Sequence, residues 1–93
     1  MATVQVRLPT VLRPAAGGLS QVSVDGEAVG QVVDRLIADY PALETNLVDE
    51  AGDVRKFVNI YLNDEDIRFL EKLETPVVEG DEVAILPAVA GGQ

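Results

Sequence analysis

Apolar and polar residues alternate in two segments near the start of the chain. The alternation spans residues 3–8, ends at Pro9 and returns in residues 20–24. A period of two is typical of a strand with one buried face. The intervening residues 10–19 contain proline and glycine, which favour turns and loops. The pattern therefore predicts an antiparallel hairpin with a long connecting loop.

The period changes in residues 27–40, which are predicted to form a helix. Six apolar residues recur three or four positions apart and share one helical face: Val29, Val32, Val33, Leu36, Ile37 and Tyr40. Pro41 is expected to end this helix. Gly30 lies inside it at a cost of about 1 kcal/mol relative to alanine. We interpret this glycine as a point where the helix packs closely on the sheet.

The second half of the chain predicts three more strands. Residues 42–54 are irregular, apart from a short helical turn expected at 43–47. Residues 56–62 alternate strongly and predict a strand. Two shorter strands are expected at 67–69 and 82–86.

The predicted order is strand, strand, helix, strand, strand, strand. This is an α+β fold with one mixed sheet and one long helix on one face. The first and last strands are expected to pair in parallel at the centre, as in ubiquitin-like β-grasp folds. Residues 1–87 would form one β-grasp domain, because 93 residues seldom support two cores. Residues 88–93 are expected to form a flexible C-terminal tail.

The chain is strongly acidic, with 16 acidic and 7 basic residues and a formal net charge of −9. Nucleic acids and anionic membranes bind clustered Lys and Arg, so neither is an expected partner. The longest apolar run, 83–90, is far shorter than the roughly 20 residues that span a bilayer. The charge suits a protein that meets basic partner surfaces. Acidity for solubility alone is the alternative.

Cysteine and histidine are both absent. The chain therefore offers no disulfide, thiolate nucleophile, imidazole base or thiolate–imidazole metal site. Residues 1–7 do not resemble a signal peptide, because no basic leader precedes an apolar core. We expect a cytoplasmic protein that is not itself an enzyme and binds neither a metal nor a cofactor.

Three consecutive carboxylates, Asp64, Glu65 and Asp66, raise the question of a cation site. A calcium loop needs spaced ligands, an obligatory glycine and a closing glutamate. This segment lacks that pattern, so we interpret it as a solvated turn.

Aromatic residues are rare, and two of the four fall on one side of a predicted strand. Phe57 and Tyr61 alternate with the aliphatic residues of 56–62, so they are expected on the sheet face away from the helix. Together with Phe69 and Leu86 they form a predicted partner-docking face. Packing of the aromatic rings under loops is the alternative.

The last strand leads into a slender tail made of Pro87, Ala88, Val89, Ala90, Gly91 and Gly92. These six residues extend roughly 20 Å when straight. Their small side chains suit threading through a narrow channel to a partner's active site, and glycine adds backbone freedom. A frayed terminus is the alternative, because chain ends commonly carry small residues and lack order.

Nearly the whole chain resembles the MoaD/ThiS family of sulfur carriers. The resemblance rests on the β-grasp order, the run GDEVAILP at 80–87 and the pair Gly91-Gly92. The runs FVNIYLNDEDIRF at 57–69 and PAVAGG at 87–92 look most like the actinobacterial carriers of cysteine biosynthesis.

The resemblance implies that the chemistry belongs to Gly92. In this family an ATP-dependent, E1-like adenylating enzyme converts the terminal glycine carboxylate to an acyl-adenylate, and sulfur then displaces AMP to give a thiocarboxylate. In the cysteine subfamily a pyridoxal-phosphate synthase supplies the aminoacrylate that this sulfur attacks, and a zinc metallopeptidase releases the cysteine. ATP and pyridoxal phosphate would therefore be used by the partner enzymes.

Gln93 departs from the family pattern, in which the terminal glycine is free. We expect a peptidase to remove it. Cysteine is the favoured end product, while a molybdenum cofactor precursor, thiamine and a secondary metabolite stay open. In the molybdenum case the chain would be the small subunit of molybdopterin synthase. A ubiquitin-like protein modifier or interaction module is the alternative from another functional class.

Overall fold

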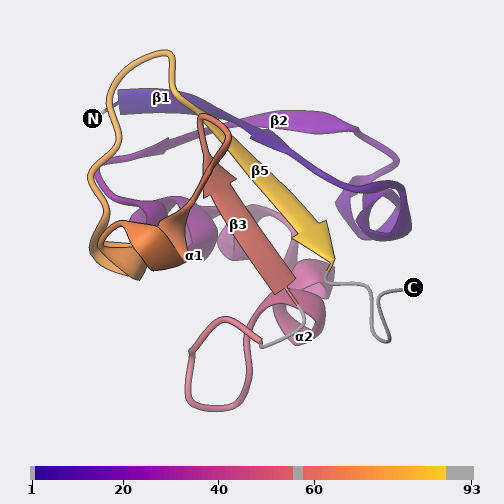
Figure 1. Cartoon of the computed structure of the whole chain (residues 1–93). Coiled ribbons are helices and arrows are strands. Elements are labelled where there is room, and N and C mark those ends of the chain that lie inside the picture. The colour runs from indigo at the N-terminus through magenta and orange to yellow at the C-terminus, as the bar shows by residue number, and fades with distance from the viewer. Residues whose placement is uncertain (1, 56–57, 88–93) are drawn as a thin grey trace.

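The computed structural model describes residues 2–55 and 58–87 and contains one five-stranded sheet with the order β2-β1-β5-β3-β4 (Figure 1). The strands are β1 (Ala2–Arg7), β2 (Gln21–Gly26), β3 (Val58–Leu62), β4 (Glu65–Asp66) and β5 (Glu82–Pro87). The α-helices are α1 (Val29–Asp39) and α2 (Glu44–Leu47). Four short 3₁₀ helices lie in the described connections, η1 (Thr10–Ala16), η2 (Pro41–Leu43), η3 (Ile67–Phe69) and η4 (Lys72–Glu74).

The strand pairing confirms the predicted β-grasp arrangement. β1 and β2 form an antiparallel hairpin, in which Val4 lies opposite Val24. β1 and β5 pair in parallel at the centre of the sheet, with Val6 opposite Val83. β5 also pairs with β3 in the antiparallel direction. The first and last strands of the chain are therefore neighbours at the centre of the sheet.

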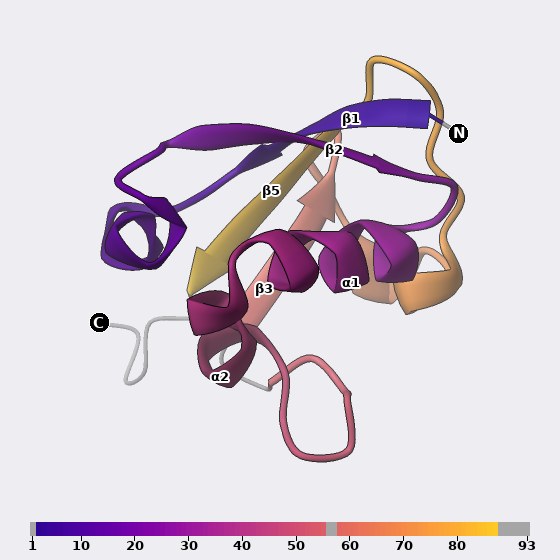
Figure 2. The same cartoon turned by 180° about the vertical axis from the view of Figure 1, so that it is seen from behind.

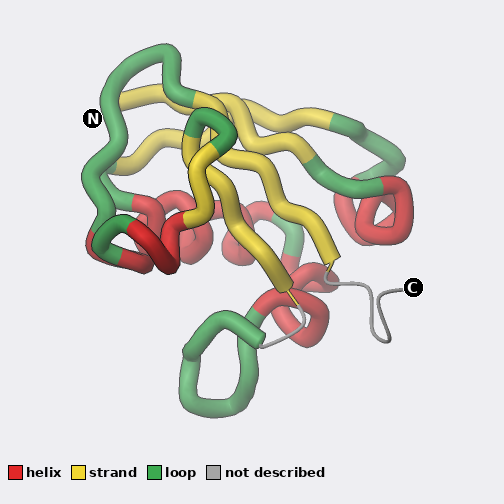
Figure 3. The backbone as a smooth tube through the Cα atoms, viewed as in Figure 1, coloured by secondary structure: helices red, strands yellow, loops and turns green. Residues whose placement is uncertain are grey.

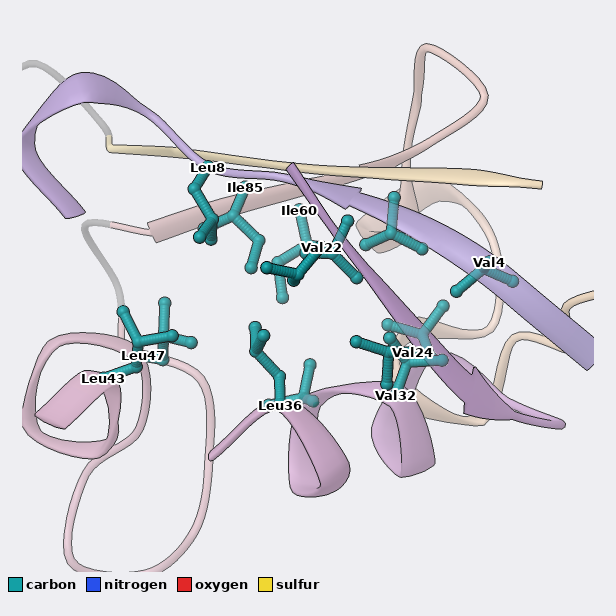
Figure 4. Packing of buried hydrophobic residues seen from close by; sticks show 14 of the residues in the cluster. Val4, Leu8, Val22, Val24, Val32, Leu36, Leu43, Leu47, Ile60 and Ile85 are labelled. Atoms are coloured by element: carbon teal, nitrogen blue, oxygen red, sulfur yellow. The ribbon is translucent and has the colours of Figure 1, made fainter. Parts of the chain in front are cut away.

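Helix α1 covers one face of the sheet (Figure 2). Its apolar stripe faces the alternate, inward-pointing residues of the strands, and Leu36 is completely buried. Leu43, at the end of η2, and Leu47, the last residue of α2, close the end of the core (Figure 4). Burying a leucine side chain contributes about 1.5–3 kcal/mol relative to exposure. The aliphatic pattern of the sequence therefore accounts for both the helix and the face of the sheet that it covers.

The prediction of a strand at 67–69 was wrong. Asn63 and Asp64 both have positive φ angles and form a two-residue turn. β4 therefore begins at Glu65, directly after the turn, and pairs with β3 there. After β4 the carboxylate of Asp66 accepts a hydrogen bond from the backbone N–H of Arg68 at 2.9 Å. This cap starts η3 in place of a longer strand.

Three smaller expectations also needed correction. The connection between β1 and β2 contains η1 and is not a plain loop (Figure 3). Helix α1 begins at Val29, because the preceding residues pair with the chain near Pro76. A Cβ on Gly30 would lie 3.0 Å from the carbonyl oxygen of Leu73. The close approach at this glycine is therefore to η4 and not to the sheet.

Candidate functional site

The end of β5 is where the folded domain leads into the predicted tail. β5 is held by β1 on one edge and by β3 on the other, and its last residue, Pro87, lies opposite Val58. Val83 and Ile85 are buried against the core, with 0% and 1% of their surface exposed. Backbone pairing on both edges and burial on one face fix the position and direction of this strand.

The other face of the sheet, which we call the open face, points away from α1. Because strand side chains alternate, Ala84 and Leu86 lie on this face. The register places Ala84 opposite Tyr61 and Leu86 opposite Asn59. Leu86 is 45% exposed, and Tyr61 is half-buried. Two of the predicted docking residues, Tyr61 and Leu86, therefore lie in adjacent strands on one face.

Of the other two predicted docking residues, the structure describes only Phe69. Phe69 lies in η3, outside the strands of the sheet, and is 82% exposed. Phe57 lies outside the described residues, as do Ala88 to Gln93 and with them the predicted reactive Gly92. Their roles stay predictions.

A shallow hollow on the open face adjoins Leu86, and we call it the docking hollow. It is lined mainly by Arg7, Pro9, Thr10, Arg13, Gln21, Tyr61, Asp64, Ala84 and Leu86. Arg7 Nη1 lies 3.4 Å from Glu82 Oε1 in a long, exposed ion pair, and Arg13 Nε donates to the Leu8 carbonyl at 3.2 Å. Exposed ion pairs such as Arg7–Glu82 contribute about 0–1 kcal/mol to stability. Arg7 can therefore exchange this weak partner for an acidic group of another protein. The hollow combines the side chains of Tyr61, Ala84 and Leu86 with two guanidinium groups and the carboxylate of Asp64.

The two arginines were not among the predicted site residues. Arg7 carried a usable signal, because it lies on the polar side of the first alternating segment, and the parallel pairing of β1 with β5 sets it opposite Ala84. Arg13 carried no such signal. It reaches the hollow because η1 folds the β1–β2 connection back toward the sheet.

A second polar cluster lies where β4 ends. The guanidinium of Arg68 donates to the carboxylate of Asp66 from Nη2 at 2.7 Å and from Nε at 3.2 Å. Arg68 Nη2 also donates to Asn59 Oδ1 at 2.9 Å. The hydrogen bonds from the Arg68 side chain and backbone lower the pKa of Asp66, although burial opposes them. The same side-chain hydrogen bond raises the pKa of Arg68.

This cluster corrects the interpretation of residues 64–66 as a solvated turn. Asp64 and Glu65 are exposed, but Asp66 is only 7% exposed and is paired with Arg68. Within residues 2–55 and 58–87, no three His, Cys, Asp or Glu side chains converge as a metal site requires. None of the helices in the described part of the chain is both long and apolar enough to span a membrane.

The chain belongs to the ThiS family, whose model matches residues 6–92. Its sequence is 48% identical to the sulfur carrier protein CysO of Mycobacterium tuberculosis over 91 residues, which cover 96% of this chain and 98% of that protein. The matched family region ends at Gly92, the residue that is predicted to carry the reactive group.

Solved structures agree with this family assignment. The crystal structure of the Amycolatopsis orientalis BexX/CysO complex contains a chain with a TM-score of 0.87 and 42% identity, covering 96% of this chain and 99% of that one. The solution structure of small archaeal modifier protein 1 from Methanosarcina acetivorans has a TM-score of 0.86 and 40% identity, covering 99% and 98%. The β-grasp fold is thus shared by proteins named as carriers and as modifiers.

Proposed function

We propose that this protein is a sulfur carrier and not an enzyme, and that it bears sulfur as a thiocarboxylate on Gly92. The observation that carries the proposal is that, in a member of the ThiS family, the central strand β5 is followed after three intervening residues by the pair Gly91-Gly92. The high identity to a protein named as a sulfur carrier supports the same function. Cysteine biosynthesis is the proposed destination, by analogy with CysO.

The proposed loading reaction has two steps. A carboxylate oxygen of Gly92 attacks the α-phosphorus of ATP, so that pyrophosphate leaves and an acyl-adenylate forms. A sulfur nucleophile then attacks the activated carbonyl, and AMP leaves with the electron pair of the broken C–O bond. A free carboxylate is a poor electrophile, which is why activation must come first. An E1-like adenylating enzyme would provide the ATP site.

Residues 87–91 would carry Gly92 into the partner's active site. The chain's own contribution is to bind the partner through a rigid domain while the tail reaches the reacting groups. Holding the carrier at one surface raises the effective concentration of its terminal group at another. Small side chains along the tail would leave room for a narrow channel.

Gln93 must be removed before this chemistry can begin. While Gly92 is joined to Gln93, its carbonyl carbon belongs to a peptide bond, so Gly92 itself has no carboxylate that could be adenylated. We propose that a peptidase hydrolyses this bond and so frees the Gly92 carboxylate. A zinc metallopeptidase is the proposed class, both for this trimming and for release of the finished product.

The open face is proposed as the docking surface for these partners. The exposed Leu86 of β5 and the half-buried Tyr61 of β3 supply apolar area on this face, and Phe57 and Phe69 are proposed to extend it. Arg7 and Arg13 would orient the bound partner by pairing with its acidic groups. The BexX/CysO complex supports the view that this fold docks on a partner protein. We propose a pyridoxal-phosphate synthase as the partner that accepts the sulfur.

Protein modification is the second candidate function, because the chain also resembles a small archaeal modifier protein at 40% identity. In that case the activated Gly92 carbonyl would be attacked by a lysine amine, which forms an isopeptide bond. The two functions share the activation step and differ in the nucleophile.

Intact-mass spectrometry of the protein recovered from cells of its source distinguishes these functions. The carrier proposal expects a form that ends at Gly92, a form with one sulfur in place of oxygen, and a form that carries an added cysteine. Recovery only of lysine-linked adducts would support modification. Recovery only of the chain that still ends in Gln93, without any added group, would contradict both.

A further inference from the structure

Strand β2 forms one edge of the sheet, and the proposed function does not use this edge. In the strand order β2-β1-β5-β3-β4 only β1 lies beside β2. The two strands pair one residue to one, from Arg7 opposite Gln21 to Ala2 opposite Gly26, so β2 contains no bulge along this length. β2 also lacks lysine and proline, two residues that commonly protect edge strands. We call the outer side of this strand the β2 edge.

The backbone of β2 directs alternate residues toward β1 and toward the β2 edge. Residues opposite each other in an antiparallel pair exchange both of their hydrogen bonds or neither. Gln5, which lies opposite Ser23, donates its backbone N–H to Asp81 on the β5 side of β1, at 3.0 Å. Ser23 therefore directs its own N–H and C=O outward. The same holds for Gln21 and Asp25, which lie two positions away on either side.

The residues that direct their backbone outward are accessible. Gln21, Ser23 and Asp25 are all exposed, whereas Val22 and Val24 between them are buried against the core. Within residues 2–55 and 58–87, no backbone hydrogen bond joins the outer side of β2 to another segment. An exposed strand edge with unpaired N–H and C=O groups is a template for pairing with another extended chain.

The charge around the β2 edge is acidic. Asp25 and Glu27 are exposed, and residues 14–34 contain three acidic residues but neither lysine nor arginine. Arg7 lies beside the opposite end of β2 and is already paired with Glu82. A second copy of the chain would bring a further net charge of −9 to this edge. A basic segment of another protein therefore fits the β2 edge better than a second copy does.

Asp25 defines where the positive charge of such a segment would lie. Its Oδ1 accepts a hydrogen bond from Thr3 Oγ1 on β1 at 2.7 Å, which orients the carboxylate on the open face. The hydroxyl of Thr3 is neutral, so this bond leaves the negative charge of Asp25 in place. Side chains directly opposite each other on neighbouring antiparallel strands have Cβ atoms about 4.5–5.5 Å apart, and opposite charges there attract. The position opposite Asp25 therefore favours lysine or arginine.

We propose that the β2 edge is a second binding site, which takes an extended segment of a partner protein with alternating apolar and polar residues and a basic residue opposite Asp25. The backbone of the segment bonds to Gln21, Ser23 and Asp25 and adds a strand to the sheet. Its apolar side chains continue the layer of Val22 and Val24 on the side of the sheet covered by α1 (Figure 2). The proposal does not depend on sulfur transfer, so either can fail alone.

The test is an NMR titration of the ¹⁵N-labelled full chain with three blocked heptapeptides. VKVTVKV and VEVTVEV are palindromic, so in either strand direction a charged residue lies opposite Asp25 when the threonine lies opposite Ser23. The third peptide is VKVTVKV with methylated backbone nitrogens at both lysines and the threonine, which keeps the charge and removes the donors that face β2. We expect VKVTVKV to shift the amide signals of Gln21, Ser23 and Asp25, and to bind about fivefold more tightly than either other peptide.

Two pairs of variants separate charge from backbone pairing. Asp25→Asn keeps an acceptor for Thr3 but removes the charge, so it should abolish the preference for VKVTVKV over VEVTVEV. The control Glu65→Gln, on β4 at the other edge of the sheet, should retain that preference. Ser23→Pro removes an outward N–H and no bond to β1, so it should weaken the binding of VKVTVKV, whereas Ser23→Ala should not.

The comparison of the three peptides on the unaltered chain is decisive, because it requires no variant to fold. Equal binding of VKVTVKV and its methylated form would show attraction by charge alone and overturns the proposal. Equal binding of VKVTVKV and VEVTVEV also overturns it. So do shifts confined to Ala84 and Leu86 in the docking hollow, or no shift at about 2 mM peptide, which marks binding too weak for a site. Self-association that sedimentation detects and Ser23→Pro abolishes would assign the β2 edge to a second copy and likewise overturns the proposal.

Discussion

Pro87, the last residue of β5, lies directly opposite Val58, the first residue of β3. The central strand therefore ends at the same end of the sheet at which β3 begins, beside α2 (Figure 1). Pairing with β1 as far as Ala84 and with β3 as far as Pro87 fixes this end of β5. A partner that binds the open face next to Pro87 is therefore also positioned relative to the first residue of the predicted tail.

Leu86→Ala should weaken binding to the adenylating partner by about tenfold, because it removes exposed apolar area that we place at the centre of the interface. The domain should stay folded, since Leu86 is 45% exposed. Val78→Ala is a matched control, because Val78 is 63% exposed and does not line the docking hollow. Isothermal titration of both variants measures the effect. Equal affinities for the two variants would remove Leu86 from the interface.

Asp66 should make the stability of the domain sensitive to acid. Hydrogen bonds from Arg68 lower the pKa of Asp66 in the folded state, so this carboxylate stabilises the fold above its unfolded pKa. The stabilisation is lost as the pH falls below about 4 and through the lowered pKa of the folded state. The melting temperature of the unaltered chain should therefore fall more steeply below pH 4 than that of Asp66→Asn. Parallel curves for the two proteins would contradict this role.

The turn between β3 and β4 offers a pair of opposite predictions. Asp64 has a φ of 73° and an exposed side chain, so Asp64→Gly should stabilise the domain by about 0.5 kcal/mol by relieving a left-handed conformation. Asn63 has a φ of 51°, but its side chain bonds to Asp81 Oδ1 and to the backbone N–H of Glu82, both at 3.0 Å. Asn63→Gly should therefore destabilise the domain by about 1 kcal/mol.

Chemical denaturation of the two glycine variants measures both changes in the free energy of unfolding. Both residues occupy the same two-residue turn, so each variant serves as the control for the other. Stabilisation of both would show that the bonds from Asn63 to the start of β5 contribute nothing. Destabilisation of both would show that backbone conformation does not decide the effect at Asp64.

The sequence predicted the elements that are held by burial. The alternating and helical patterns predicted β1, β2, β3, β5 and α1. Each of these elements buries one face against the core, so its apolar residues recur with the period of a strand or a helix. The parallel pairing of β1 with β5 followed from the β-grasp order. These features depend on apolar periodicity, which is a local property of the sequence.

The features that were missed depend on contacts between distant parts of the chain. Asp66 was interpreted as part of a solvated turn, because its neighbours are acidic. Its partner Arg68 is held in place by Asn59 on β3, which requires the hairpin to be formed. Arg13 joins the docking hollow only because η1 folds back. The docking role of Phe57 and the reactive role of Gly92 fall outside the described residues and stay predictions.

The central claim is that Gly92 becomes a thiocarboxylate once Gln93 is gone. The most direct measurement is the intact mass of two purified forms, the full chain and a chain ending at Gly92, after incubation with ATP, an adenylating partner and a sulfide source. Each carries the same folded domain, so the full chain is the matched control. We predict that the form ending at Gly92 gains the mass of one sulfur-for-oxygen exchange and that the form ending at Gln93 does not change. An unchanged Gly92 form in the presence of an adenylating partner that binds it would contradict the account.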